Sequence, residues 1–134
     1  MFTHVCQVRF RDLDAMRHVN NSVYLTYLEE TRIAYMNARR SGSLFDAEHG
    51  TIMARSEINY RFPATLGDAL VIEMTVGQIR RSSFEFDYSL YRQADRRLIA
   101  QAKTVMVCYN YTLNMPVRVP DAWLAALRAD QPAV

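Results

Sequence analysis

The hydrophobic pattern of this chain changes its period, and that change limits the folds open to it. From Ser22 to about Arg40 there is no glycine or proline, and apolar side chains recur at helical spacing. After Gly50 apolar and polar residues alternate as far as Tyr111, which is the pattern of half-buried strands. One long helix followed by a series of strands predicts an α+β fold, with the helix packed on a mostly antiparallel sheet.

The breaks in this pattern locate the individual elements. A first strand is expected at residues 6–10, and one further short helical turn at residues 44–49, after the stop signal Gly42. Pro120 precedes an amphipathic stretch that predicts a closing short helix. The remaining strands are expected at residues 57–62, 70–76, 84–90 and 98–111, the last of them central. The prediction is a five-stranded antiparallel sheet that curls around the long helix.

Size and composition exclude several classes of protein. The 134 residues suffice for one domain, expected over residues 1–134, and 50% hydrophobic residues with 22% charged ones exclude a mainly disordered chain. No apolar run reaches the length of a membrane span, and the N-terminus does not resemble a secretory signal. No basic stripe of the kind found in nucleic-acid binders is present. We therefore expect a cytoplasmic protein with neither a membrane nor a nucleic acid as partner.

The numbers and positions of cysteine, histidine and arginine residues indicate whether a disulfide, a metal site or a phosphate-binding site is expected. Cys6 and Cys108 each lie among alternating apolar residues, which favours buried thiols over a disulfide. His4, His18 and His49 share no ligand spacing with one another or with the cysteines, so no metal site is expected. Fifteen of the 16 basic residues are arginines, whose fork of donors suits phosphate groups, although many can simply pair with the 14 acids.

The segment between the first strand and the long helix concentrates polar side chains that can do chemistry. It contains Asp12, Asp14 and His18, followed by Asn20 and Asn21, which are good helix N-caps. The start of a helix presents unpaired N–H groups that can polarise a carbonyl oxygen. A carboxylate beside it can act as a nucleophile or as a base for water. From spacing alone, surface or capping roles are the more common interpretation of both acids.

This segment also resembles a known family. The run from Arg11 to Glu30, RDLDAMRHVNNSVYLTYLEE, is similar to the signature of hotdog-fold acyl-CoA thioesterases of the 4-hydroxybenzoyl-CoA thioesterase type. It is also similar to the corresponding stretch of plant acyl-carrier-protein thioesterases. The later residues 59–63, NYRFP, with Gly67 and Asp68, extend the resemblance over nearly the whole chain. The resemblance implies a hotdog fold and thioester hydrolysis.

The resemblance also implies roles for single residues. Asp14 matches the catalytic carboxylate, and His18 matches an assisting histidine of the plant enzymes. Arg17 stands where the family motif usually has glycine, so a loop of different shape or an added charge near the ligand is expected. Another branch of the family takes its acid from the long helix, but Glu29 and Glu30 follow a different motif and are expected to be structural or interfacial charges, paired with Arg32 or another neighbour.

Substrate contacts are expected from two parts of the chain. Asn20 and Tyr24 are assigned to the binding site, although capping and packing are their simplest roles. The turn between the third and fourth strands is basic and is the candidate contact for the phosphates of coenzyme A. Its residues are Arg80, Arg81, Ser82 and Ser83. A basic hairpin is equally common as plain surface.

The predicted function is hydrolysis of an acyl-CoA thioester to the free acid and CoA. No metal or redox cofactor is expected, and coenzyme A enters as part of the substrate. Because the sheet has exposed edges, a homo-oligomer is expected, either a dimer or a tetramer built from dimers. Two alternatives stay open, a thioesterase acting on acyl-carrier protein and a non-catalytic module that binds acyl-CoA.

Overall fold

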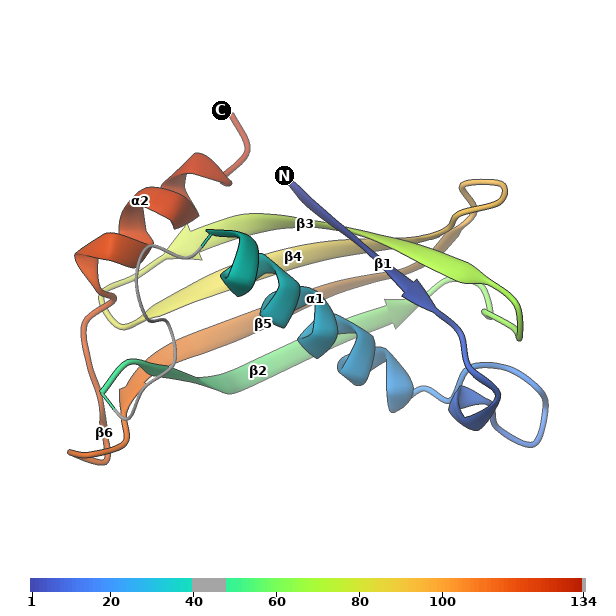
Figure 1. Cartoon of the computed structure of the whole chain (residues 1–134), viewed down its shortest axis with the longest axis horizontal. Helices are drawn as coiled ribbons and strands as arrows, with labels where there is room; N and C mark the ends of the chain where they lie inside the picture. The colour runs from blue at the N-terminus through green and yellow to red at the C-terminus, as the bar shows by residue number, and fades with distance from the viewer. Residues whose placement is uncertain (40–47, 134) are drawn as a thin grey trace.

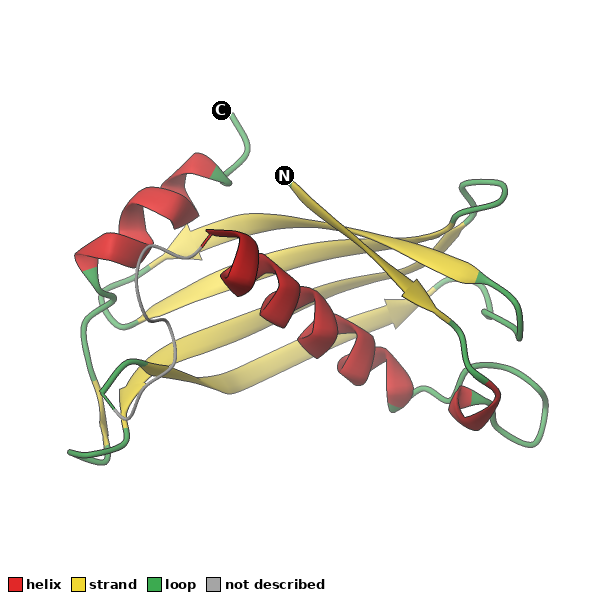
Figure 2. Ribbon diagram, in the orientation of Figure 1, coloured by secondary structure: helices red, strands yellow, loops and turns green. Residues whose placement is uncertain are grey.

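The fold is an antiparallel sheet with one long helix across its face, as Figures 1 and 2 show. The computed structural model describes residues 1–39 and 48–133. The elements in chain order are β1 (Phe2–Gln7), a short 3-10 turn (Phe10–Asp12), α1 (Val23–Arg39), β2 (Gly50–Tyr60), β3 (Ala69–Ile79), β4 (Ser83–Arg92), β5 (Leu98–Asn110), β6 (Met115–Pro116) and α2 (Asp121–Ala129). The α+β architecture predicted from the pattern is confirmed.

The strands follow the order β1-β3-β4-β5-β2, and every neighbouring pair is antiparallel. The two-residue strand β6, which was not predicted, pairs with the end of β5. The expectation that β5 is the central strand was wrong, because β4 occupies the middle of the order. β1 and β2 form the two edges, and β2 reaches the far edge after the chain has crossed the sheet through α1 (Figure 1).

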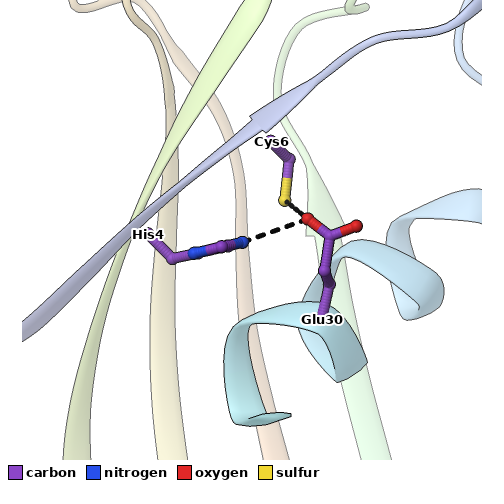
Figure 3. A group of neighbouring side chains, drawn as sticks. All are labelled: His4, Cys6 and Glu30. Carbon is purple, nitrogen blue, oxygen red and sulfur yellow. Dashed lines mark hydrogen bonds and ion pairs between the residues drawn. The ribbon is translucent and has the colours of Figure 1, made fainter. Parts of the chain in front are cut away.

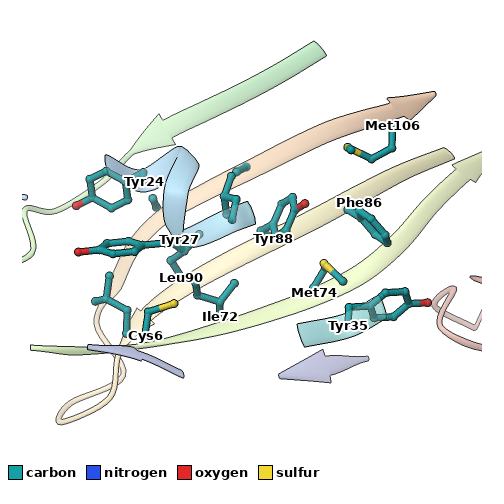
Figure 4. Close-up of a cluster of buried hydrophobic side chains, with 14 of the residues drawn as sticks. Cys6, Tyr24, Tyr27, Tyr35, Ile72, Met74, Phe86, Tyr88, Leu90 and Met106 are labelled. Carbon is teal, nitrogen blue, oxygen red and sulfur yellow. The ribbon is translucent and has the colours of Figure 1, made fainter. Parts of the chain in front are cut away.

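The core lies between α1 and the face of the sheet that it covers, and Figure 4 shows part of it. Alternate residues of β3, among them Leu70, Ile72 and Met74, are at most 1% exposed. Leu28 and Tyr35 of α1 are also fully buried, so the helical and alternating periods meet in one core. Burial of a large apolar side chain contributes about 1.5–3 kcal/mol, which makes this contact the main source of stability.

The first strand ends earlier than the sequence pattern predicts. Residues 6–10 were expected in it, but β1 stops at Gln7, and Phe10 is 80% exposed in the 3-10 turn. The chain turns because the Asp12 backbone N–H donates to the Arg9 carbonyl and the Arg9 N–H donates to the Asp12 carboxylate. Val8 remains buried beyond the end of the strand, which explains why the apolar alternation was misleading.

Other boundaries differ by smaller amounts. β2 begins at Gly50 rather than at residue 57, and it ends at Tyr60, so Phe62 lies outside it. The expected short turn at residues 44–49 falls mostly on residues 40–47, outside the described residues. The buried, unpaired state of the cysteines Cys6 and Cys108 is confirmed. Among the residues that the structure describes, no helix is long and apolar enough to cross a membrane.

The two ends of the chain meet at one buried carboxylate. Asp130, just beyond α2, is 5% exposed and accepts hydrogen bonds from the Tyr35 hydroxyl at 2.9 Å and from Arg39 at 2.8 and 3.1 Å. The amino group of Met1 lies 3.5 Å from the same carboxylate. α2 is thereby fastened to the C-terminal half of α1.

Candidate active site

Asp12 has a structural role in the segment that precedes α1. Its side chain is buried, and its Oδ2 accepts hydrogen bonds from the Tyr27 hydroxyl at 2.6 Å and from the Arg9 N–H at 2.9 Å. The Asp12 backbone carbonyl accepts from the Asn20 N–H at 2.8 Å. The loop from Asp12 to Asn20 is therefore closed at its base, and its first residue is fixed to α1 through Tyr27. Because it is buried and accepts a hydrogen bond from a side chain of α1, this carboxylate serves to hold the loop.

Asp14, two residues on, is exposed and is held only by the backbone. Its Oδ1 accepts from the Met16 N–H at 2.9 Å and from the His18 N–H at 3.2 Å. The Asp14 N–H donates to the His18 carbonyl at 2.7 Å, which closes the loop. Among the described residues nothing donates to Oδ2. The carboxylate is thus oriented by one oxygen and has the other available for chemistry.

Arg17 adopts the backbone conformation that a glycine would allow. Its φ is 63°, in the left-handed region, where a residue with a Cβ pays about 1–2 kcal/mol. The Arg17 N–H donates to the Asp14 carbonyl at 3.0 Å and completes the turn. The substitution of glycine by Arg17 therefore leaves a tight turn around Asp14, at an energetic cost.

A groove of about 290 Å³ opens beside Asp14. Its wall comes from the Asp14 loop, from the start of α1 and from the end of β2. The residues that line it are Asp14, His18, Val19, Asn21, Tyr24, Tyr60, Arg61, Phe62 and Pro63. The structure therefore brings together three of the predicted site residues, Asp14, His18 and Tyr24. Asn21, Tyr60 and Arg61 were not assigned to the site, although the motif that carries the resemblance contains them.

Contacts across the groove tie β2 to the start of α1. The Tyr60 hydroxyl donates to the Asn21 carbonyl at 3.2 Å, and the Tyr24 and Tyr60 rings meet edge-on with centroids 5.3 Å apart. The Val19 N–H donates to the Ala64 carbonyl at 2.8 Å. Burial raises the pKa of Tyr24, so its phenol stays neutral at physiological pH. The groove wall is a fixed structure supported from both sides.

The start of α1 supplies backbone donors at this groove. Asn20 Oδ1 accepts from the Ser22 N–H at 3.1 Å and from the Ser22 hydroxyl at 3.0 Å, and the Val23 N–H donates to the Asn20 carbonyl. The amides that follow in the first turn have no intrahelical acceptor and carry the positive end of the helix dipole. Asn20 thus orders the helix start and is not among the residues that line the groove.

The basic turn at residues 80–83 lies at the other end of the sheet. β1 pairs with β3 so that Gln7 faces Ala69, and β3 then runs to Ile79, about 33 Å away at 3.3 Å per residue. Within one chain, this turn and Asp14 therefore do not meet. Arg80, Arg81, Ser82 and Ser83 were predicted to contact the phosphates of coenzyme A, and that prediction specified no distance between the turn and Asp14.

The turn nevertheless forms part of a basic groove of about 550 Å³ beside α2. Four arginines line it: Arg80, Arg81, Arg118 and Arg128. Arg80 is paired with Glu85 at 2.8 Å and Arg118 with Asp121 at 3.1 Å. Ser82 and Ser83 are not among the residues that line this groove; their backbone carbonyls accept hydrogen bonds from the N–H groups of Cys108 and Arg80.

The helix acids differ from each other in their surroundings. Glu29 lines an apolar groove of about 280 Å³ between α1 and the sheet, with Met36, Phe86 and Met106 among its neighbours. Glu30 contacts neither Asp14 nor Arg32. Its carboxylate accepts from Cys6 and His4 of β1, each at 3.0 Å. His4 and Cys6 were expected to share no ligand spacing, yet they are alternate residues of β1 and point to the same side.

Known proteins with similar sequences and structures share this arrangement of elements. A family model described as the thioesterase-like superfamily matches residues 8–127. The chain is 31% identical over 103 residues to the long-chain acyl-CoA thioesterase FadM of Escherichia coli (strain K12), covering 76% of this chain and 78% of that protein. It is 27% identical over 140 residues to a 1,4-dihydroxy-2-naphthoyl-CoA hydrolase of Gloeothece citriformis (strain PCC 7424), covering 98% and 96%.

Among solved structures, a thioesterase from Thermus thermophilus complexed with coenzyme A and Zn superposes with a TM-score of 0.83 at 29% identity, covering 98% of this chain and 96% of that one. The family match includes the Asp14 loop and every strand of the sheet except β1. The chain therefore belongs to the thioesterase-like superfamily and has the hotdog fold that its sequence motif implied.

Proposed function

We propose that this protein hydrolyses an acyl-CoA thioester to a carboxylic acid and free CoA, with Asp14 as the reacting carboxylate. The observation that carries the proposal is the position of Asp14. It is exposed, oriented through Oδ1 by two backbone N–H groups, and lines a groove with the start of α1. The names of the relatives, acyl-CoA thioesterase and naphthoyl-CoA hydrolase, support the same reaction class.

The geometry supports two versions of the chemical step. In one, Asp14 takes a proton from water while the water oxygen bonds to the thioester carbon. In the other, Asp14 itself attacks, and water then hydrolyses the resulting anhydride. In both, the carbonyl oxygen becomes negatively charged and is stabilised by the first-turn amides of α1. The carbon–sulfur bond breaks as this negative charge returns to the carbonyl, and the CoA thiolate leaves and takes up a proton; in the second version this step forms the anhydride and precedes its hydrolysis.

The proposal includes a dimer formed through the β2 edge. β2 is exposed along most of its length, including Ile52, Met53 and Tyr60 at 40%, 38% and 46%. A two-fold axis that pairs β2 antiparallel with its copy places the Thr51 end of one chain beside the Tyr60 end of the other. Because Tyr60 lines the Asp14 groove and Thr51 and Met53 line the apolar groove beside Glu29, the Asp14 groove of one chain then joins the apolar groove of the other. Light scattering should therefore give at least twice the 15.5 kDa of one chain.

The joined grooves suggest where the substrate lies. The apolar groove contains Met36, Phe86 and Met106 and suits an acyl chain or ring. The arginine-lined groove at residues 80–81 is close to it, at the same end of the sheet, and suits the phosphates of coenzyme A. Coenzyme A is a component of the complex with the Thermus thermophilus neighbour. No cofactor is needed for this step, and the cytoplasmic location expected from the sequence remains part of the proposal.

The arginine-lined groove favours one second candidate, hydrolysis of an acyl group carried on acyl-carrier protein. Arg81 and Arg128 line it without a partner of opposite charge among the described residues, and a carrier protein would dock on such a basic surface. The non-catalytic binding module, which Arg17 motivated, has less support. The turn around Asp14 is formed despite Arg17, so a carboxylate oriented for the reaction is retained.

The test is thiol release from short, medium, long and aromatic acyl-CoAs and from an acyl-carrier protein, with wild type and Asp14→Asn side by side. The expected result is turnover of at least one class by wild type and a loss of about 10³-fold or more in the variant. Calorimetry with the same acyl-CoAs should show that Asp14→Asn still binds them. Binding of acyl-CoA without thiol release from any substrate by wild type contradicts the proposal and supports the binding module.

A further inference from the structure

Three side chains with metal-ligating atoms meet between the edge strand β1 and α1, away from the Asp14 groove. His4 and Cys6 are alternate residues of β1 and point toward the helix, while Glu30 points back from α1 (Figure 3). The His4 Nε2 and the Cys6 Sγ each lie 3.0 Å from Glu30 Oε2. All three ligand atoms lie within 4.8 Å of one another. None of the three residues lines the groove beside Asp14.

The cluster has a buried floor and an open side. Cys6 is 2% exposed, whereas the side chains of His4 and Glu30 are 26% and 45% exposed. An ion can therefore reach the sulfur past the histidine and the carboxylate. A thiol reacting directly with solvent oxidants is disfavoured, because burial and the neighbouring carboxylate raise the pKa of Cys6 and keep it protonated.

We propose that His4, Cys6 and Glu30 bind one divalent cation of the zinc type, with water in the fourth position. A thiolate, an imidazole and a carboxylate together form the mixed sulfur, nitrogen and oxygen donor set that suits zinc. One thiolate and one carboxylate balance the double charge of the ion, so the half-buried centre is neutral. In a tetrahedral zinc site with ordinary bond lengths, neighbouring donors lie about 3.4–3.5 Å apart. The 3.0 Å contacts need to open by only a few tenths of an ångström.

Binding exchanges a proton for the metal ion. In the metal-free protein the Cys6 thiol donates to Glu30. When zinc binds, the Cys6 sulfur–hydrogen bond breaks, the proton goes to solvent, and a sulfur–zinc bond forms. The positive charge of Arg9 favours the ionised forms of both Cys6 and Glu30. Among the described residues, the phenol of Tyr27 also lies near Cys6, and burial and the Asp12 carboxylate raise its pKa, so it stays neutral.

The bound ion would fasten the edge strand to the helix. Among the described strands, β1 pairs with β3 alone, and it also contacts α1. A ligand that binds only the folded state raises the free energy of unfolding. The increase grows with the logarithm of the ratio between the ligand concentration and its dissociation constant. Zinc is therefore expected to raise the unfolding temperature of the whole protein without entering the groove in which the reaction is proposed.

The experiment measures zinc binding to chelator-treated protein by calorimetry and Co²⁺ binding by absorption spectroscopy. Wild type is expected to bind one ion per chain and to show the thiolate-to-cobalt charge-transfer band. In Cys6→Ser the band should disappear, and in Cys6→Ser, His4→Gln and Glu30→Gln zinc affinity should fall by at least about tenfold. Cys108→Ser is the matched control, because Cys108 is also buried and free but has no ligand partner in the cluster.

Circular dichroism of each variant without metal separates loss of binding from loss of the fold. Glu30→Gln keeps a side-chain acceptor for Cys6 and is expected to fold normally. Three outcomes would overturn the proposal: no cobalt or zinc binding by wild type, a charge-transfer band that persists in Cys6→Ser, or a band that is lost in Cys108→Ser. In those cases the three residues are a hydrogen-bonded contact between β1 and α1 and nothing more.

Discussion

The two ends of the molecule use a carboxylate in opposite ways. At the α2 end, Asp130 is buried, and its oxygens accept from Tyr35, from Arg39 and from the N-terminus. At the other end, Asp14 is exposed and accepts only from backbone N–H groups, at one oxygen. The difference shows that burial with side-chain donors makes a carboxylate structural, whereas exposure with backbone donors at a single oxygen orients it and leaves it able to react.

The largest expected effect on stability comes from removing the charge at the α2 end. Asp130→Asn leaves the half-buried Arg39 without its charged partner and should lower the free energy of unfolding by about 2–3 kcal/mol. This is less than for a fully buried pair, because the Arg39 side chain is 35% exposed. Urea denaturation of wild type and Asp130→Asn measures this change in the free energy of unfolding. Asp121→Asn, which changes an aspartate that is 84% exposed, is the matched control and should cost no more than about 0.5 kcal/mol.

Acidification should reproduce part of this loss. The hydrogen bonds from Arg39 are the main cause that lowers the pKa of Asp130 in the folded protein. When the pKa of a carboxyl group is lower in the folded than in the unfolded protein, its ionisation stabilises the fold. This stabilisation is fully present above the unfolded-state pKa of about 3.9, and it is lost as the pH falls through the folded-state pKa. The stability difference between wild type and Asp130→Asn should therefore shrink between pH 5 and the acid limit of folding. Parallel stability curves down to that limit would contradict the assignment.

The smallest expected effect concerns the turn around Asp14. Arg17→Gly relieves the left-handed backbone at φ 63° but adds freedom to the unfolded chain, so a net stabilisation of about 0.5–1 kcal/mol is expected. Arg11→Gly, at an exposed position without a positive φ, should destabilise instead. Thermal unfolding compares the two. A destabilised Arg17→Gly protein would show that the arginine side chain itself supports the loop.

Much of the fold could be predicted because it depends on local periodicity. The absence of glycine and proline after Ser22 gave the helix, which the structure begins at Val23, and the alternation from Leu70 to Val76 gave the buried face of β3. Edge strands were harder to predict. In β2 most residues are exposed on both faces, so the start at Gly50 had no clear apolar alternation to mark it.

The site could be predicted only in part, because its residues are distinguished by tertiary contacts. Asp12 and Asp14 look alike in sequence, and only the Tyr27 hydroxyl, one turn into α1, separates their roles. The meeting of Cys6 with Glu30 depends in the same way on how α1 lies against β1. The separation of residues 80–83 from Asp14 follows from the length of β3, a signal that the strand pattern already contained.

The most direct measurement compares Asp12→Asn with Asp14→Asn in two assays, thiol release from the preferred acyl-CoA and unfolding in urea. Asp12→Asn should lose about 1.5–3 kcal/mol of stability, because the hydrogen bonds from Tyr27 and Arg9 lose their charged acceptor. Asp14→Asn should keep the stability of wild type within about 0.5 kcal/mol and lose activity about 10³-fold or more. Full activity in Asp14→Asn, or a stability loss in it as large as in Asp12→Asn, would contradict the assignment of Asp14 as the reacting carboxylate.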